Sequence, residues 1–213
     1  MIAALVPVKA LPRAKSRLLP HLGRGGVEAL QIAMLTDVVT ALRGVPELTR
    51  VAVVTPDVDV AKAAEAAGAE ALLRADPGLN QAIEGASAEL APGPGDGVLV
   101  VLGDVACARS EELGELVRSV SSPGVALAPS GDGGTSALLR LPRDVIAAGF
   151  GPQSARVHRE RAQAAGVSYR ESALPSLAVD VDEPEDLDAL RRSGAAGPHT
   201  RALLALLDAE SRP

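Results

Sequence analysis

Three aspartates of this chain follow apolar segments, at places where strands of a sheet would end. Asp104 follows the apolar run 97–103, and Asp180 and Asp182 follow a second apolar segment, 177–179. In a parallel sheet, side chains at the carboxyl ends of the strands lie along one edge, where ligands bind. Hard divalent cations prefer carboxylate oxygens. The three aspartates together predict a metal site, although for any one of them a simple turn residue is an equal alternative.

Asp180 and Asp182 are separated by a single residue. In an extended segment alternate side chains point to the same side, so both carboxylates would face one way. The segment 182–187 also has the pattern of a helix start, with Pro184 in its first turn. Asp182 could therefore be only an N-cap. An N-cap would not explain the paired Asp180, so we interpret both residues as metal ligands.

Positive charge is concentrated near the amino terminus, although the whole chain has a formal net charge of -6. The first 27 residues contain no Asp or Glu. Their cationic side chains are Lys9, Arg13, Lys15, Arg17 and Arg24. A solvated basic surface is the alternative interpretation. Combined with the aspartates, these cations predict a site for a polyphosphate bound with Mg2+.

Two glycine-containing turns could add backbone amides to an anion site. The segment 130–135, Ser-Gly-Asp-Gly-Gly-Thr, could wrap an anion, but a hairpin turn is the simpler interpretation. The segment 150–156 predicts a turn that enters a helix, with Ser154 as N-cap and free amides facing a phosphate. Capping alone explains this second segment equally well.

Several other classes of site lack their motifs. The chain has neither Gly-x-Gly-x-x-Gly nor Gly-x-x-x-x-Gly-Lys-Ser/Thr, which disfavours dinucleotide enzymes and P-loop NTPases. One cysteine excludes an internal disulfide and a multi-cysteine metal cluster, and we expect Cys107 to be an apolar filler. The histidines show no metal-ligand spacing, and we expect all three at the surface. They are His21, His158 and His199.

The composition also bears on partners and location. With no Trp, one Phe and one Tyr, the chain has few aromatic platforms for nucleic-acid bases. Its negative net charge also disfavours binding to nucleic acid. The apolar start 1–8 is too short for a secretory leader, and no apolar run approaches the ~18 residues of a membrane span. We therefore expect a cytoplasmic protein without a nucleic-acid or membrane partner.

The hydrophobic pattern predicts the elements that hold these residues. Short apolar runs alternate with helical stretches, which predicts one α/β domain over 1–213, with a mostly parallel central sheet flanked by helices. Gly44 and Gly68 are helix stop signals. The predicted strands are 2–8, 51–55, 70–73, 98–102, 125–128, 136–141 and 177–179. The predicted helices are 26–42, 58–67, 79–90, 110–120 and 200–207.

Six motifs, in order over nearly the whole chain, resemble the guanylyltransferases of the CofC and FbiD type, which act in biosynthesis of the deazaflavin coenzyme F420. The motifs are 7–9 with 14–18, 79–83, 103–104, 132–139, 150–154 and 180–187. Two positions depart from the family pattern. Family members commonly have Leu-Pro where this chain has Val105-Ala106, and often Asn in place of Ser136. Neither departure removes a predicted metal ligand.

The resemblance implies a nucleotidyltransferase fold similar to the glycosyltransferase A type. It implies transfer of GMP from GTP to the phosphate of a three-carbon acid, namely phosphoenolpyruvate, 2-phospho-L-lactate or phosphoglycerate, with release of pyrophosphate. By the same resemblance, Mg2+ would be bound by Asp104, Asp180 and Asp182, which with Lys15 would be catalytic. The nucleotide would be bound by Lys9, Lys15, Arg17, Leu79 and Asn80. The acceptor would be bound by Thr135, Gly151 and Ser154.

Two other functions stay open at this point. One is a nucleotidyltransferase acting on a sugar phosphate or on molybdopterin, since the broad fold is shared. The other is a GTP-binding regulatory protein without catalysis, suggested by the altered segment 105–107. The resemblance also suggests a downstream transferase of the same pathway as a partner. The sequence does not choose between a monomer and a homodimer.

Overall fold

Seven strands form one sheet in the computed structural model, which describes residues 1–11 and 15–210. The strand order is β3-β2-β1-β4-β6-β5-β7, and β6 is the strand that runs antiparallel to its neighbours. The strands are β1 Ile2–Pro7, β2 Arg50–Thr55, β3 Glu70–Leu73, β4 Gly97–Val101, β5 Gly124–Pro129, β6 Thr135–Leu141 and β7 Ser168–Glu171. The predicted mostly parallel α/β fold is confirmed. Arg13 lies outside the described residues.

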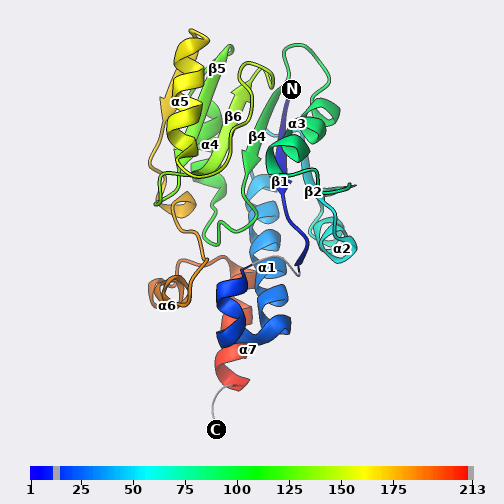
Figure 1. Cartoon of the computed structure of the whole chain (residues 1–213), viewed down its shortest axis with the longest axis vertical. Coiled ribbons are helices and arrows are strands. Elements are labelled where there is room, and N and C mark those ends of the chain that lie inside the picture. Colours follow the sequence, from blue (N-terminus) through cyan, green and yellow to red (C-terminus); the bar gives the residue numbers. More distant parts are fainter. Residues whose placement is uncertain (12–14, 211–213) are drawn as a thin grey trace.

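Helices cover both faces of this sheet (Figure 1). They are α1 Leu19–Arg43, α2 Val58–Ala66, α3 Leu79–Leu90, α4 Ser110–Arg118, α5 Ser154–Ala164, α6 Pro184–Ser193 and α7 Pro198–Glu210. Two short 3-10 helices are η2 Ser16–Leu18 and η3 Pro175–Leu177. On one face, α1, α2 and α4 bury alternate strand residues such as Ala4 and Val6. On the other face, α3 and α5 bury the intervening ones, such as Ala3 and Leu5. The central strands are apolar on both sides because both sides are covered.

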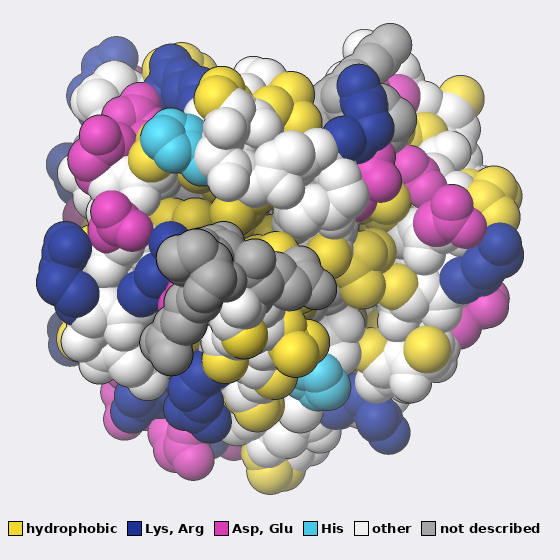
Figure 2. Space-filling view, turned by 90° about the horizontal axis from the view of Figure 1, so that it is seen from below, with side chains coloured by type: hydrophobic (Ala, Val, Ile, Leu, Met, Phe, Trp, Pro, Cys, Tyr) yellow, Lys and Arg dark blue, Asp and Glu magenta, His cyan; other side chains and the backbone are white. Residues whose placement is uncertain are grey.

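A third apolar cluster lies away from the sheet, where the first half of α1 meets α6 and α7 at the lower end of the molecule (Figure 1). Gly23 interrupts α1 with a φ of 64°, a conformation that glycine adopts without strain. Seen from below, this end has hydrophobic side chains in the middle and charged ones mostly around them (Figure 2). The cluster matters for the site because Val181, between the two predicted metal ligands, is fully buried in it.

One predicted strand is wrong and one strand was missed. The segment 177–179 forms no strand, since η3 occupies Pro175–Leu177 and only Asp180 makes an isolated bridge, to Val105. The edge strand β7 escaped prediction because its residues are polar and largely exposed. The stop signals are confirmed: Gly44 is the C-cap of α1, and Gly68, with φ of 88°, follows the C-cap of α2.

One helical stretch, Ser16–Arg43, is long and apolar enough to cross a membrane by length and composition. Polar residues interrupt its apolar stripe, so no continuous apolar run marks it in the sequence. In the fold, 61% of its most apolar window is buried. That burial, against the sheet and against α7, is what a core helix requires.

Candidate active site

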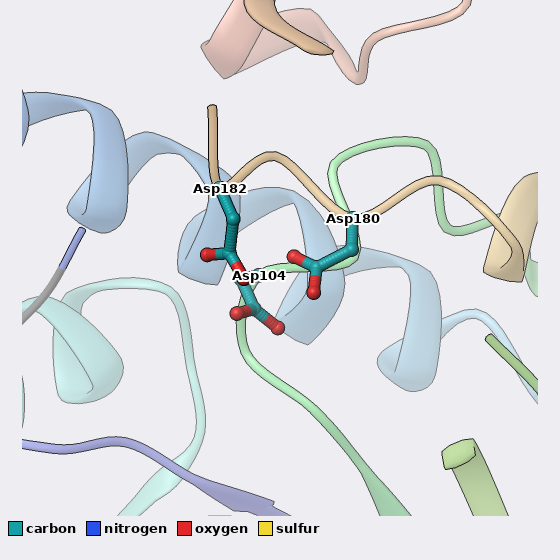
Figure 3. Close-up of side chains that lie close together, drawn as sticks. All are labelled: Asp104, Asp180 and Asp182. Carbon is teal, nitrogen blue, oxygen red and sulfur yellow. The ribbon is translucent and has the colours of Figure 1, made fainter. Parts of the chain in front are cut away.

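The three predicted carboxylates converge on one point. One oxygen each of Asp104, Asp180 and Asp182 lies within 4.8 Å of the others, and Figure 3 shows the side chains turned toward one another. Asp104 lies in the loop after β4, and the Val105–Asp180 bridge fixes the other two beside it. As predicted, Asp180 and Asp182 share one side of their segment while Val181 points into the third cluster. Their position after a strand, in contrast, was predicted wrongly.

Lys15 lies among these carboxylates rather than opposite them. Its Nζ is 3.3 Å from Asp104 Oδ2, 3.7 Å from Asp180 Oδ1 and 3.1 Å from Asp182 Oδ1. It also donates to the Val181 carbonyl at 2.7 Å, and its side chain is 4% exposed. Lys15 reaches this place with a left-handed backbone, φ 45°, which is costly for a lysine. The ammonium thus offsets part of the negative charge of the cluster.

The proximity of these groups shifts their pKa values. Burial lowers the pKa of Lys15, but the attraction of Asp104, Asp180 and Asp182 outweighs it, so the pKa is raised overall. The pKa of Asp180 is raised to about 7, mainly by burial and also by the like charges of Asp104 and Asp182, while Lys15 opposes the shift. The site is therefore one in which an added cation would be strongly stabilised.

A cavity of about 250 Å³ opens beside the carboxylates. Its lining includes Lys9, Lys15, Leu79, Asp104 and Asp182. The structure thereby brings two of the predicted phosphate-binding cations and one predicted base-binding residue to the predicted metal site. The other two of these cations within the described residues, Arg17 and Arg24, do not line the cavity. Arg24 is exposed on α1, whereas Arg17 pairs with Glu183 at the start of α6.

Gln31 also lines this cavity and was missed in the sequence. Its side chain is 7% exposed, and its Oε1 accepts no hydrogen bond from the described residues. The available signal was a polar residue four positions after Val27 and four before Leu35, on the buried face of α1. An unpaired buried amide costs about 1–3 kcal/mol unless a ligand satisfies it.

Both polar atoms of the Asn80 side chain are hydrogen-bonded to the protein backbone. Its Nδ2 donates to the Phe150 carbonyl at 3.0 Å, and its Oδ1 accepts the Phe150 N–H at 2.8 Å. These two hydrogen bonds tie the start of α3 to the segment that precedes α5. Direct contact of Asn80 with a nucleotide base stays a prediction, but its main partner in the structure is backbone.

The predicted acceptor residues Thr135 and Ser154 lie together. Ser154 Oγ donates to Thr135 Oγ1 at 2.9 Å, and the two residues are 3% and 1% exposed. Ser154 is the first residue of α5 and not its N-cap, which is Gln153. Two of the predicted free amides are taken, because Ser154 N–H donates to the Gly151 carbonyl and Ala155 N–H to the Gly133 carbonyl. Gly151, with φ of 142°, makes the turn that allows this closure.

Three remaining predictions have clear outcomes. Glu183 is the N-cap of α6 and forms a capping box with Asp186, so the alternative that Asp182 is the cap is wrong. His158 is fully buried, so its predicted surface position is also wrong, while His21 and His199 are exposed. Burial of a histidine could not be foreseen because its partners come from distant segments. Cys107, 3% exposed in the third cluster, is the predicted apolar filler.

Known proteins resemble this chain over nearly its whole length. Phosphoenolpyruvate guanylyltransferase of Rubrobacter xylanophilus is 42% identical over 202 residues, covering 91% of this chain and 95% of that protein. The protein of the same name from Sphaerobacter thermophilus is 35% identical, covering 91% and 94%.

Solved structures support the same fold. A proposed nucleotide-diphospho-sugar transferase from Desulfovibrio desulfuricans G20 superimposes with a TM-score of 0.78 at 19% identity, covering 98% of this chain and 95% of that one. A nucleotidyl transferase from Methanothermobacter thermautotroptrophicus gives 0.66 at 20% identity, covering 91% and 97%. The family described as "Guanylyl transferase CofC like" matches residues 2–210. This chain is a member of the CofC-like guanylyl transferase family.

Proposed function

We propose that this guanylyltransferase joins GMP from GTP to the phosphate of a three-carbon phospho-acid, releases pyrophosphate, and serves coenzyme F420 biosynthesis. Phosphoenolpyruvate is the first candidate acceptor, because it stands in the names of the curated relatives, and 2-phospho-L-lactate is the second. The observation that carries the proposal is the cluster of Asp104, Asp180 and Asp182 with Lys15, set beside a cavity that also contains Lys9.

The donor set of the site fits Mg2+. Three carboxylates offer hard oxygen ligands within 4.8 Å of one another, and Mg2+ binds carboxylates together with substrate phosphates and water. When bound, such an ion would neutralise phosphate charge and polarise a phosphoryl oxygen. Because Lys15 Nζ lies among the same carboxylates, an ion bound by all three requires this side chain to turn away.

The reaction requires no protein base. A phosphate monoester has its second pKa at about 6, so the acceptor phosphate is already ionised near neutrality. One of its oxygens forms a bond to the α-phosphorus of GTP, the bond from that phosphorus to the bridging oxygen breaks, and pyrophosphate leaves. The absence of a histidine from the described cavity lining agrees with this chemistry.

The main barrier is repulsion between two anions, and the chain's own residues act against it. Lys9 and Lys15 place positive charge at the cavity, which lowers the cost of bringing two phosphates together. Leu79 offers an apolar surface to the nucleotide base. Lys15, once displaced from the carboxylates, is available to the phosphates.

The test is an acceptor panel with purified protein, GTP and Mg2+. Each three-carbon phospho-acid, a hexose 1-phosphate and molybdopterin are supplied in turn, and products are identified by mass. We expect the product to be labile, so it is measured promptly or trapped by the downstream transferase that we propose as partner.

Diphosphate-linked GMP on phosphoenolpyruvate or 2-phospho-L-lactate supports the proposal. Transfer only to the sugar phosphate or to molybdopterin contradicts it, as does GTP binding without pyrophosphate release for any acid. Replacement of GTP by ATP, CTP or UTP tests the guanine preference in the same assay.

A further inference from the structure

A buried histidine joins the segments where the acceptor is proposed to bind. His158, on α5, is fully buried. Its Nε2 accepts the Gly149 N–H at 2.9 Å, and its Nδ1 lies 3.1 Å from Thr135 Oγ1. The ring also packs edge-on against Phe150, with centroids 5.2 Å apart. The reaction mechanism above does not use this side chain.

These contacts determine which ring nitrogen carries the proton. A backbone N–H can only donate, so Nε2 must be the unprotonated acceptor. Nδ1 of the neutral ring then carries the hydrogen and donates to Thr135 Oγ1. Burial is the main cause that lowers the pKa of His158 to about 4, and the charges of Arg161 and Arg140 add to it, so the ring is neutral at pH 7.

This tautomer has a consequence for the two neighbouring hydroxyls. Thr135 and Ser154 carry one hydroxyl hydrogen each, and one of these hydrogens is used in the bond between them. His158 donates a hydrogen bond to Thr135 Oγ1 and accepts none from either hydroxyl. No other acceptor among the described residues takes the second hydrogen. One hydroxyl hydrogen of the pair is therefore left to bind a ligand oxygen.

The pair lies beside the candidate active site. Residue Ser136, next to Thr135, accepts the Leu102 N–H through its carbonyl at 3.0 Å, and Leu102 precedes Gly103 and Asp104. On the other side, Asn80 binds Phe150, and its neighbour Leu79 lines the cavity. Hydrogen bonds and adjacent residues of the chain together connect the loop of Asp104 with the cavity wall at α3.

We propose that His158 is a positioning residue for an anionic acceptor, which deepens the proposed function and rests on it. Through Nδ1 it donates to Thr135 Oγ1 and so orients the Thr135–Ser154 pair, whose spare hydroxyl hydrogen is left for a carboxylate or phosphate oxygen. Through Nε2 it fixes the segment Gly149–Gly151, whose Gly151 N–H makes no hydrogen bond to a described residue. The ligand class is a small phosphorylated carboxylic acid.

Three variants separate the two contacts. In His158→Asn the amide can replace Nδ1 as donor to Thr135, whereas in His158→Gln it can replace Nε2 as acceptor for Gly149. His158→Phe keeps the ring shape and neither bond. We expect the KM for the acceptor to rise at least about 10-fold in His158→Phe and His158→Gln and much less in His158→Asn, with the KM for GTP within about 2-fold of wild type.

Amide hydrogen exchange measures the contact between His158 Nε2 and the Gly149 N–H independently of turnover. The Gly149 amide is expected to stay protected in His158→Gln and to exchange faster in His158→Asn and His158→Phe. Ala162→Gly is the matched control, because Ala162 is fully buried on the same helix and takes part in neither hydrogen bond. Gly in a helix costs about 1 kcal/mol, so this control reports what destabilisation of α5 alone does.

Equal acceptor KM in all three variants, or the same rise in Ala162→Gly, overturns the proposal. If the variants do not fold, the ¹⁵N spectrum of wild-type histidine decides, because the Nε2–H tautomer contradicts it directly. If wild type transfers GMP to no acid, the proposed function fails by itself. Calorimetric titration of phosphoenolpyruvate into wild type and His158→Phe then still tests acceptor positioning, and equal affinities would refute it.

Discussion

Each carboxylate of the cluster is expected to be indispensable, and Asp104 provides the cleanest test. In Asp104→Asn one hard ligand becomes a neutral amide, while the volume of the side chain is kept. Because metal-assisted charge stabilisation supplies several kcal/mol of the barrier reduction, we expect pyrophosphate release to fall at least about 100-fold. Asp59→Asn, on the exposed start of α2, is the control and should keep full activity. Wild-type rates in Asp104→Asn would refute its role.

Lys15 is expected to act on metal binding and on catalysis in opposite directions. Its ammonium occupies the space among the carboxylates, so Lys15→Met removes a competitor for an added cation. We expect Mn2+ to bind the nucleotide-free variant about 10-fold more tightly, equivalent to about 1.4 kcal/mol. Turnover should fall, because the phosphates lose a partner. Calorimetric titration with Mn2+ measures the first effect, and weaker binding in the variant would contradict the competition.

The lowered pKa of His158 implies a pH dependence of the free energy of unfolding. Its pKa is about 4 in the folded protein, against an ordinary value of 6.5, so between these values the unfolded chain binds a proton that the folded protein does not. Stability from this group therefore rises with pH through this window and is lost on acidification, by about 3 kcal/mol at most.

Urea unfolding at pH 7 and pH 4.5 measures this contribution as a difference between variants. Wild type should lose more stability on acidification than His158→Phe, while a His21→Ala control, altered at an exposed histidine, should behave as wild type. An identical loss in wild type and His158→Phe would show that His158 does not titrate as inferred.

Residue types alone predicted the carboxylates but not their surroundings. Asp104, Asp180 and Asp182 could be found because carboxylates in this pattern have a definite chemistry. The left-handed backbone that brings Lys15 among them has no signal in its own residue type. The partners of Asn80 and His158 come from segments that only the folded chain brings close. Roles that depend on distant backbone groups could not be foreseen.

At the scale of elements, the start of α6 orients one of the predicted metal ligands, Asp182. Asp186 Oδ2 accepts the N–H groups of Asp182 and Glu183, at 3.1 and 2.9 Å. Asp186→Ala should cost about 1 kcal/mol of stability through the lost cap, and several-fold in Mn2+ affinity because the backbone at Asp182 is freed. Asp188→Ala, on the same helix with an exposed pair to Arg191, is the control. Unchanged Mn2+ affinity in Asp186→Ala would show that the cap does not orient Asp182.

Elements with a strong hydrophobic pattern were predictable, and those defined by tertiary contacts were not. The buried strands β1 and β4 and the helix α3 have clear apolar patterns, so their ranges were close to those observed. The segment 177–179 is apolar as well, yet Leu177 fills the core from a 3-10 helix that begins at Pro175. Burial alone does not distinguish a strand from an irregular segment. The edge strand β7 is the opposite case, because it is a regular strand whose polar residues have no apolar pattern.

At the scale of the whole molecule, the third apolar cluster packs beneath the predicted metal site. Val181 is buried with residues of α1, α6 and α7, which holds the flanking aspartates toward Asp104. The fold class followed from the alternation of elements, but this cluster did not, because it joins the two ends of the chain. The helix 200–207 was predictable without its partner, because no local pattern indicates where it docks.

Asp37 connects this docking to stability. It is 3% exposed on α1, and its carboxylate accepts the N–H groups of His199 and Thr200 at the start of α7, at 2.9 and 2.8 Å. Hydrogen bonds to a charged group contribute about 1.5–3 kcal/mol, so Asp37→Ala should lower the unfolding free energy by about 2 kcal/mol. Gly197→Ala should act similarly, because a Cβ there would lie 2.3 Å from Asp37 Cγ.

Because α7 and Val181 share one cluster, loosening of α7 should also change the positions of Asp180 and Asp182, which flank Val181. In both variants we expect faster proteolytic release of the carboxyl-terminal helix and a Mn2+ affinity several-fold weaker than that of wild type. Ala202→Ser, at an exposed position of α7, serves as the control for both measurements. Release of the helix with unchanged Mn2+ affinity would show that the aspartates are held by the Val105–Asp180 bridge and the α6 cap alone.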